Sequence, residues 1–167
     1  MDVFVPFLAF CQALGALVGA GAAVGSEFAY VRAMRDGKLD AAERAHLAGL
    51  ARGLRFGMTL LLLASLGLVV AAYALGAAPQ PALTPGYWML ITLALLVIGL
   101  SWALSRRRVS FALGSAAAFT AWWFLAYLVL GQLPALSFGA LVALYVVATA
   151  VLYAVLRSAR FLMTRSV

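Results

Sequence analysis

Five apolar runs, each about as long as a membrane is thick, restrict the folds open to this chain. A helix needs ~20 mostly apolar residues to cross ~30 Å of hydrocarbon. Charged residues or clusters of proline and glycine separate the five runs. The runs cover residues 3–30, 57–75, 87–104, 109–130 and 136–156. The sequence therefore predicts an all-α fold, an integral membrane bundle of five transmembrane helices in a single domain, 1–167.

The composition excludes a water-soluble enzyme. Hydrophobic residues make up 66% of the 167 residues and charged residues 10%, whereas a soluble domain holds about half apolar and about a quarter charged residues. The sequence also contains no HExxH, GxSxG or P-loop motif and no cluster of Asp or His. These are the usual catalytic constellations, so we expect a protein that is not an enzyme.

The basic residues predict the orientation of the bundle. All twelve lie between the first and second runs, between the third and fourth runs, or after the fifth run. Cytoplasmic segments of membrane proteins are enriched in Lys and Arg. We therefore expect the N-terminus outside and the C-terminus in the cytoplasm. High Ala, Leu, Gly and Arg usage suggests a bacterial source, and hence the inner (plasma) membrane.

The net charge of +7 does not indicate nucleic-acid binding in such a chain. Basic residues at the inner face meet anionic lipid headgroups at ~1 kcal/mol each. We therefore expect lipid headgroup contacts for Arg106, Arg107 and Arg108, and no nucleic-acid partner. Residues 40–54 predict a cytoplasmic amphipathic extension of the second helix, with an Asp at position 40 as its N-cap.

Small residues crowd the first run, which contains two small-xxx-small patterns, Gly15 with Gly19 and Gly21 with Gly25. Lipid provides no hydrophobic drive for helices to associate, so close approach at small residues supplies the packing. We therefore expect this helix to be central in the bundle, or to form the contact in a homo-oligomer or a larger membrane complex. A helix lining a cavity is the alternative.

Two polar residues of the first run are candidates for function. Glu27 is the only acidic residue near membrane depth, where ionisable groups are functional candidates by default. Its place near the inner interface, close to Arg32, Arg52 and Arg55, favours a structural ion pair over a gate or a substrate contact. Gln12 lies deeper, and we expect its amide to bond to a neighbouring helix or to a second copy.

Two adjacent tryptophans, Trp122 and Trp123, lie near the middle of the fourth run. Each indole N–H prefers a hydrogen-bond partner. Packing against the glycine-rich first helix is one interpretation, and an aromatic wall for a lipophilic ligand is the other. No cofactor or metal is expected, because the single His46 and the single Cys11 cannot supply a ligand set.

Two functional hypotheses follow. In the first, the protein is a carrier or binding protein for a lipophilic or weakly polar small molecule, with Gln12, Glu27, Trp122 and Trp123 as its ligand-binding residues. In the second, it is a non-catalytic accessory or assembly subunit of a larger membrane complex. The many small residues opposite a tryptophan pair suggest internal space and favour the first.

Overall fold

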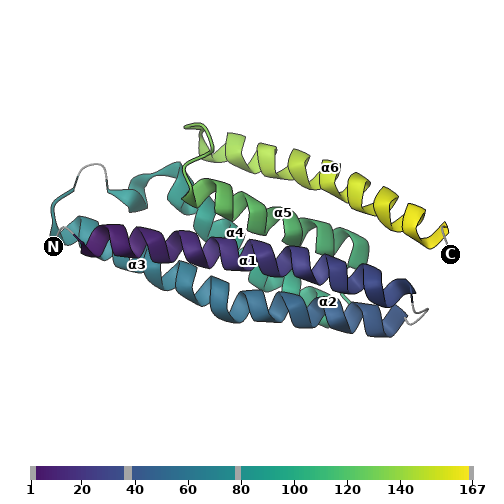
Figure 1. The fold of residues 1–167 in the computed structure, drawn as a ribbon. Helices are drawn as coiled ribbons and strands as arrows, with labels where there is room; N and C mark the ends of the chain where they lie inside the picture. Colours follow the sequence, from purple (N-terminus) through teal and green to yellow (C-terminus); the bar gives the residue numbers. More distant parts are fainter. Residues whose placement is uncertain (1–2, 36–38, 78–79, 166–167) are drawn as a thin grey trace.

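The protein is a bundle of helices (Figure 1) in a computed structural model that describes residues 3–35, 39–77 and 80–165. Side chains are described in these ranges except at 33–35, 39–43, 46–47 and 162–165. No strand occurs within the described residues. The α-helices are α1 (Phe4–Arg35), α2 (Leu39–Gly53), α3 (Thr59–Ala74), α4 (Pro85–Ser105), α5 (Phe111–Val129) and α6 (Phe138–Arg165). A π-helical turn, η1 (Leu54–Met58), joins α2 to α3, and a short 3₁₀ turn, η2 (Pro81–Leu83), precedes α4.

Five helical stretches of the described chain are long and apolar enough to cross a membrane, which confirms the predicted all-helical class and the five apolar helices. They are Phe4–Arg32, Ala48–Ala74, Pro85–Ser105, Phe111–Val129 and Phe138–Phe161. Two boundaries differ from those predicted by more than five residues. The second stretch begins at Ala48 because α2, η1 and α3 form one uninterrupted helix. The last helix continues to Arg165, because Arg157 and Arg160 interrupt the apolar run without ending the helix.

The two ends of the chain lie at opposite ends of the bundle (Figure 1). Helices α1, α4 and α6 end on the side that holds the C-terminus, and α2 and α5 begin there. We call this side the C-terminal end. It includes Arg32, the connection 106–110 and Arg157, so basic residues from three separate parts of the sequence gather there.

Helix α1 lies antiparallel to the long helix formed by α2, η1 and α3, and this is the most extensive contact in the bundle. The predicted extension 40–54 corresponds to α2, and it packs along α1. A Cβ added at Gly49 would lie 2.8 Å from the Ser26 Cβ, and one at Gly53 would lie 2.7 Å from the Ala22 Cβ. The predicted capping residue Asp40 lies outside the described side chains.

The π-helical turn keeps the glycines of the long helix directed at α1. Four residues exceed one α-helical turn by about 40°, so a row of every fourth residue drifts around a regular helix. A π turn holds more residues and rotates less per residue, which reverses this drift. Gly57 therefore faces α1 together with Gly49 and Gly53, and a Cβ at Gly57 would lie 2.8 Å from the Gly15 carbonyl oxygen.

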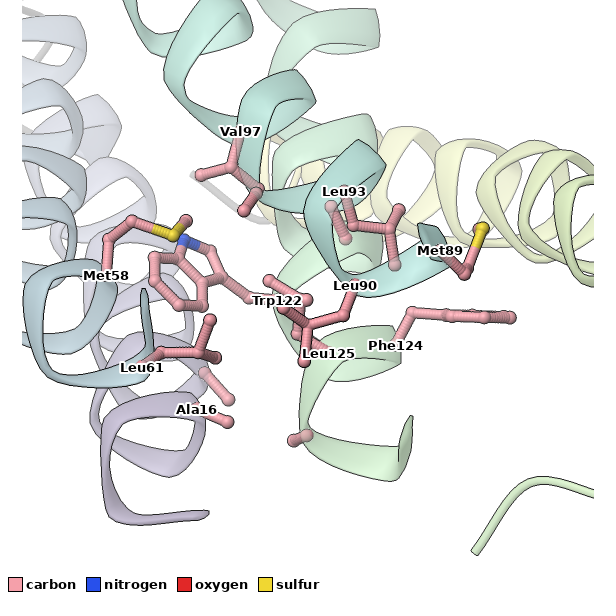
Figure 2. Close-up of a cluster of buried hydrophobic side chains, with 14 of the residues drawn as sticks. Ala16, Met58, Leu61, Met89, Leu90, Leu93, Val97, Trp122, Phe124 and Leu125 are labelled. Carbon is pink, nitrogen blue, oxygen red and sulfur yellow. The ribbon is translucent and has the colours of Figure 1, made fainter. Parts of the chain in front are cut away.

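Helix α5 is the most deeply buried of the five apolar stretches and contacts α1, α4 and α6. In its most apolar window 56% of the residues are buried, against 11% in α6. The Trp122 side chain is fully buried in the core (Figure 2). Residues of all six α-helices except α2, and of η1, belong to this cluster, among them Ala16, Met58, Leu61, Leu93, Val97 and Leu125.

The connections use residues suited to turns. Helix α4 begins two residues earlier than predicted, because Pro85 occupies its first turn and the Thr84 hydroxyl accepts a hydrogen bond from the Tyr87 N–H at 3.3 Å. Proline is favoured at the start of a helix, where no intrahelical N–H is needed. Gly131 follows α5 with a φ of 66°, a backbone conformation that glycine adopts without a steric penalty.

Candidate functional site

A buried ion pair joins α1 to α6 at the C-terminal end of the bundle. Nη2 of Arg160 donates hydrogen bonds to both carboxylate oxygens of Glu27, at 3.0 Å and 2.7 Å. The same nitrogen donates to the Ser115 hydroxyl at 2.9 Å. Three helices that are far apart in sequence therefore meet at one guanidinium group.

Two aromatic rings contact the Arg160 guanidinium. The Arg160 Cζ lies 4.8 Å from the centre of the Tyr30 ring and 5.5 Å from that of the Phe111 ring. These two rings are stacked on each other, with centroids 4.6 Å apart. A planar guanidinium over an aromatic face gains cation–π energy, so the rings add to the restraint from the hydrogen bonds. We call Glu27, Tyr30, Phe111, Ser115 and Arg160 the Glu27–Arg160 cluster.

Helical spacing explains how each element supplies its part of the cluster. Glu27 and Tyr30 are three residues apart on α1, and Phe111 and Ser115 are four residues apart on α5. Residues at these spacings share one face of a helix.

Comparisons with protein-family models, curated proteins and solved structures gave no match for this chain.

Burial makes this pair costly to maintain. The Glu27 side chain is 11% exposed and the Arg160 side chain 14% exposed. Removing charges from water costs several kcal/mol per ion, and apolar residues of similar volume often stabilise a protein as well as a buried pair does. Both residues also lie in helical stretches apolar enough to cross a membrane. The cluster is therefore the strongest candidate for a functional site among the described residues.

The partner of Glu27 comes from a part of the chain that sequence reasoning assigned to a tail. The sequence pointed to Arg32, Arg52 and Arg55, which are exposed on α1, α2 and η1. The ion pair is instead formed by Arg160, 133 positions away in sequence. If the last helix had been predicted to continue past residue 156, Arg160 would have been a candidate partner for Glu27.

The other predicted ligand-binding residues lie away from this cluster. The Gln12 amide donates to the Ser65 hydroxyl at 2.8 Å, and that hydroxyl donates to the Leu61 carbonyl at 2.6 Å. Gln12 thus bonds to a neighbouring helix, α3. It lies fifteen positions before Glu27 on α1, which is about 22 Å along the axis. The four predicted residues therefore do not line one common site.

The space expected beside the tryptophans is filled by one of them. A Cβ added at Gly19 would overlap the six-membered ring of Trp122. The missing side chain of Gly19 thus accommodates the indole, whose Nε1 is buried without a hydrogen-bond partner beside the Met58 side chain (Figure 2). Trp123 is half-buried, and its ring lies between Phe119 and Tyr127, with centroids 6.4 Å from each. Small residues opposite Trp122 therefore indicate close packing here and not a cavity.

The two small-xxx-small patterns of α1 face different surroundings. A Cβ at Gly15 would lie 2.6 Å from the Leu61 backbone nitrogen, so Gly15 and Gly19 both face other helices of the bundle. Gly21 and Gly25 are exposed, and a Cβ at either position would meet no atom within 4 Å. The second pattern therefore lies on an outer face of α1.

The arginines predicted to meet lipid headgroups are exposed in the connection between α4 and α5. The guanidinium carbon of Arg108 lies 4.9 Å from the Trp102 ring centre and that of Arg106 lies 6.0 Å from it. Arg107 adopts a φ of 53° in this turn. All three side chains remain accessible at the surface.

The described residues contain no group of three potential metal ligands. Cys11 is a free thiol of intermediate exposure in α1. The side chain of His46 lies outside the described part of the chain.

Proposed function

We propose that this protein is a multi-pass protein of a bacterial inner membrane, with its N-terminus outside and its C-terminus in the cytoplasm. Five helices long and apolar enough to span support this proposal, as does the gathering of basic residues at the C-terminal end. The sequence predicts Arg52 and Arg55 before the second span, whereas in the structure they lie within the second apolar stretch, Ala48–Ala74. Both side chains are exposed. Long arginine side chains reach the interface from such positions.

Within this membrane frame, the Glu27–Arg160 cluster lies near the cytoplasmic interface. Ser115 is four residues into α5, which is about 6 Å along the helix axis from its first residue. Ionisable residues inside membrane segments are expensive and commonly mark ligand or ion pathways. The buried ion pair is thus the observation that carries the functional proposal.

The proposed function is binding or carriage of a lipophilic or weakly polar small molecule at this cluster. Arg160 supplies hydrogen-bond donors to a carbonyl, hydroxyl or acidic oxygen, and Glu27 and the Ser115 hydroxyl oxygen supply acceptors. Tyr30 and Phe111 supply apolar ring surface beside them. A molecule with one small polar end and an apolar body matches this combination. Gln12, Trp122 and Trp123 have packing roles in this proposal.

Native mass spectrometry tests the proposal on protein extracted gently from its own membrane. The wild-type protein is expected to retain a small lipophilic mass, and Glu27→Gln/Arg160→Gln is expected to lose it. Arg157→Gln is the matched control, because Arg157 is an exposed arginine on the same helix. A wild-type spectrum with no retained molecule, or equal retention in the double variant, contradicts the proposal.

The second candidate function, a non-catalytic assembly subunit, is favoured by the outward position of Gly21 and Gly25. Glycines on an outer face permit close approach of a helix from another chain or another copy. The same spectra separate the two candidates. Stoichiometric foreign subunits that are lost in Gly21→Leu would support assembly, whereas a bound lipophilic mass on a monomer or homodimer supports binding.

A further inference from the structure

The Glu27–Arg160 cluster is closed in this structure. Its two charged side chains are only 11% and 14% exposed, and Tyr30 and Phe111 cover the guanidinium. A ligand that bonds to these groups has to displace part of the cluster. The helix that contributes Arg160 is therefore the element whose attachment controls access.

Helix α6 is attached to the bundle more weakly than the other helices. Only 11% of its most apolar window is buried, and it packs mainly on α5 with little contact to α1. Among its described residues, 138–161, the buried ones are Leu141 and Tyr145, and both lie in its first third. Between Tyr145 and Phe161, α6 therefore has no fully buried apolar side chain.

Two polar attachments fix α6 at different heights. The Tyr145 hydroxyl donates to the Ala117 carbonyl at 3.0 Å, and its ring meets the Phe124 ring edge-on at 5.9 Å. Fifteen residues later, about 22 Å along the axis, Arg160 bonds to Glu27 and Ser115. The first attachment has apolar burial behind it, whereas the second depends on charge and ring stacking.

We infer that the C-terminal half of α6 is a lateral gate, latched by the Glu27–Arg160 pair and hinged near Tyr145. This inference rests on the proposed function, because the gate controls access to the same cluster. A ligand with a polar end competes with Glu27 for the Arg160 guanidinium. Loss of the pair releases the end of α6 from α1 and opens a path between the two helices from the cytoplasmic leaflet.

Spin-label distance measurements on the full chain in lipid nanodiscs test the latch without a ligand. In a Cys11→Ser background, one label pair replaces Arg32 and Ser158 and reports on the latched end. A second pair replaces Leu17 and Val146 and reports on the hinge end. All four positions are exposed, so the labels fit without repacking.

The variant for this test is Glu27→Gln/Arg160→Gln. Removing both charges leaves no unpaired ion, so the chain avoids the folding penalty expected for Glu27→Gln alone. The latched-end distance is expected to shift to longer and broader values, while the hinge-end distance stays unchanged. Arg157→Gln is expected to leave both distances unchanged. An unchanged latched-end distance in the double variant, or equal lengthening of both pairs, overturns the latch.

The two proposals fail in different ways. A shifted latched-end distance together with no retained small molecule in native mass spectrometry supports the latch and contradicts ligand binding. A retained molecule with an unchanged latched-end distance supports ligand binding and contradicts the latch.

Discussion

At the scale of single residues, position on the helix face decides what a glycine does. Gly19 and Gly21 are two positions apart in α1, and each belongs to a small-xxx-small pattern. The backbone of Gly19 adjoins the Trp122 ring, whereas Gly21 faces outward with no atom of the chain near it. The same residue type is thus a steric requirement at one position and permits substitution at the other.

Gly19→Ala is expected to lower the free energy of unfolding by about 1–3 kcal/mol, because the added methyl group overlaps a fully buried ring. Gly21→Ala is the matched control. It meets no neighbour, so its stability is expected to stay the same or rise by up to about 1 kcal/mol through helix propensity. Thermal unfolding in detergent micelles measures both. An equal loss in the two variants would contradict the role assigned to Trp122.

At the scale of elements, the contact between α1 and the long helix depends on a turn that departs from regular geometry. Hydropathy predicts a helix here but contains no information on its π turn, η1. The turn is visible only in the backbone of the folded protein, where it directs Gly49, Gly53 and Gly57 at α1. A regular helix would carry these three glycines progressively around its surface.

Insertion of one alanine after Phe56 in η1 is expected to destabilise the protein by about 2 kcal/mol or more. The added residue rotates α2 by about 100° relative to α3. Larger side chains then replace Gly49 and Gly53 opposite α1. Phe56→Ala is the control, because this exposed side chain is absent from the α1 contact. Equal melting temperatures for the insertion and the substitution would show that the turn does not set the register.

At the scale of the whole molecule, the distribution of charge supports the proposed orientation. The connection 106–110 and the exposed Arg157 lie at the C-terminal end, whereas the connection 131–137 at the other end holds no basic residue. A membrane protein with this asymmetry inserts with its basic end in the cytoplasm.

Cysteine labelling in whole cells tests this topology. In a Cys11→Ser background, Gln132→Cys is expected to react with a membrane-impermeant maleimide in intact cells. Ser110→Cys is expected to react only after permeabilisation. Both positions are exposed in the connections of α5. Labelling of Ser110→Cys but not Gln132→Cys in intact cells would show the opposite orientation. Labelling of both positions in intact cells would exclude α5 as a membrane span.

The sequence predicted the five apolar helices because their length and hydropathy are local properties, averaged over about 20 residues. It also identified Glu27 as unusual, because a lone acidic residue near apolar surroundings stands out. It offered two interpretations for Trp122, packing against the glycine-rich first helix or an aromatic wall for a ligand, and the contact with Gly19 agrees with the first. Whether small residues leave a space or receive a ring depends on what the neighbouring helix places opposite them.

Sequence alone thus determined the helical class, the number of apolar helices and the segregation of basic residues. Tertiary structure decided that Arg160, 133 positions away in sequence, pairs with Glu27. Arg160 does so because α6 continues beyond its apolar run and packs on α5 at a height that brings this side chain to α1. Such a pairing depends on the heights and rotations of three helices, and these are set by side-chain packing between helices and not by the hydropathy of any one of them.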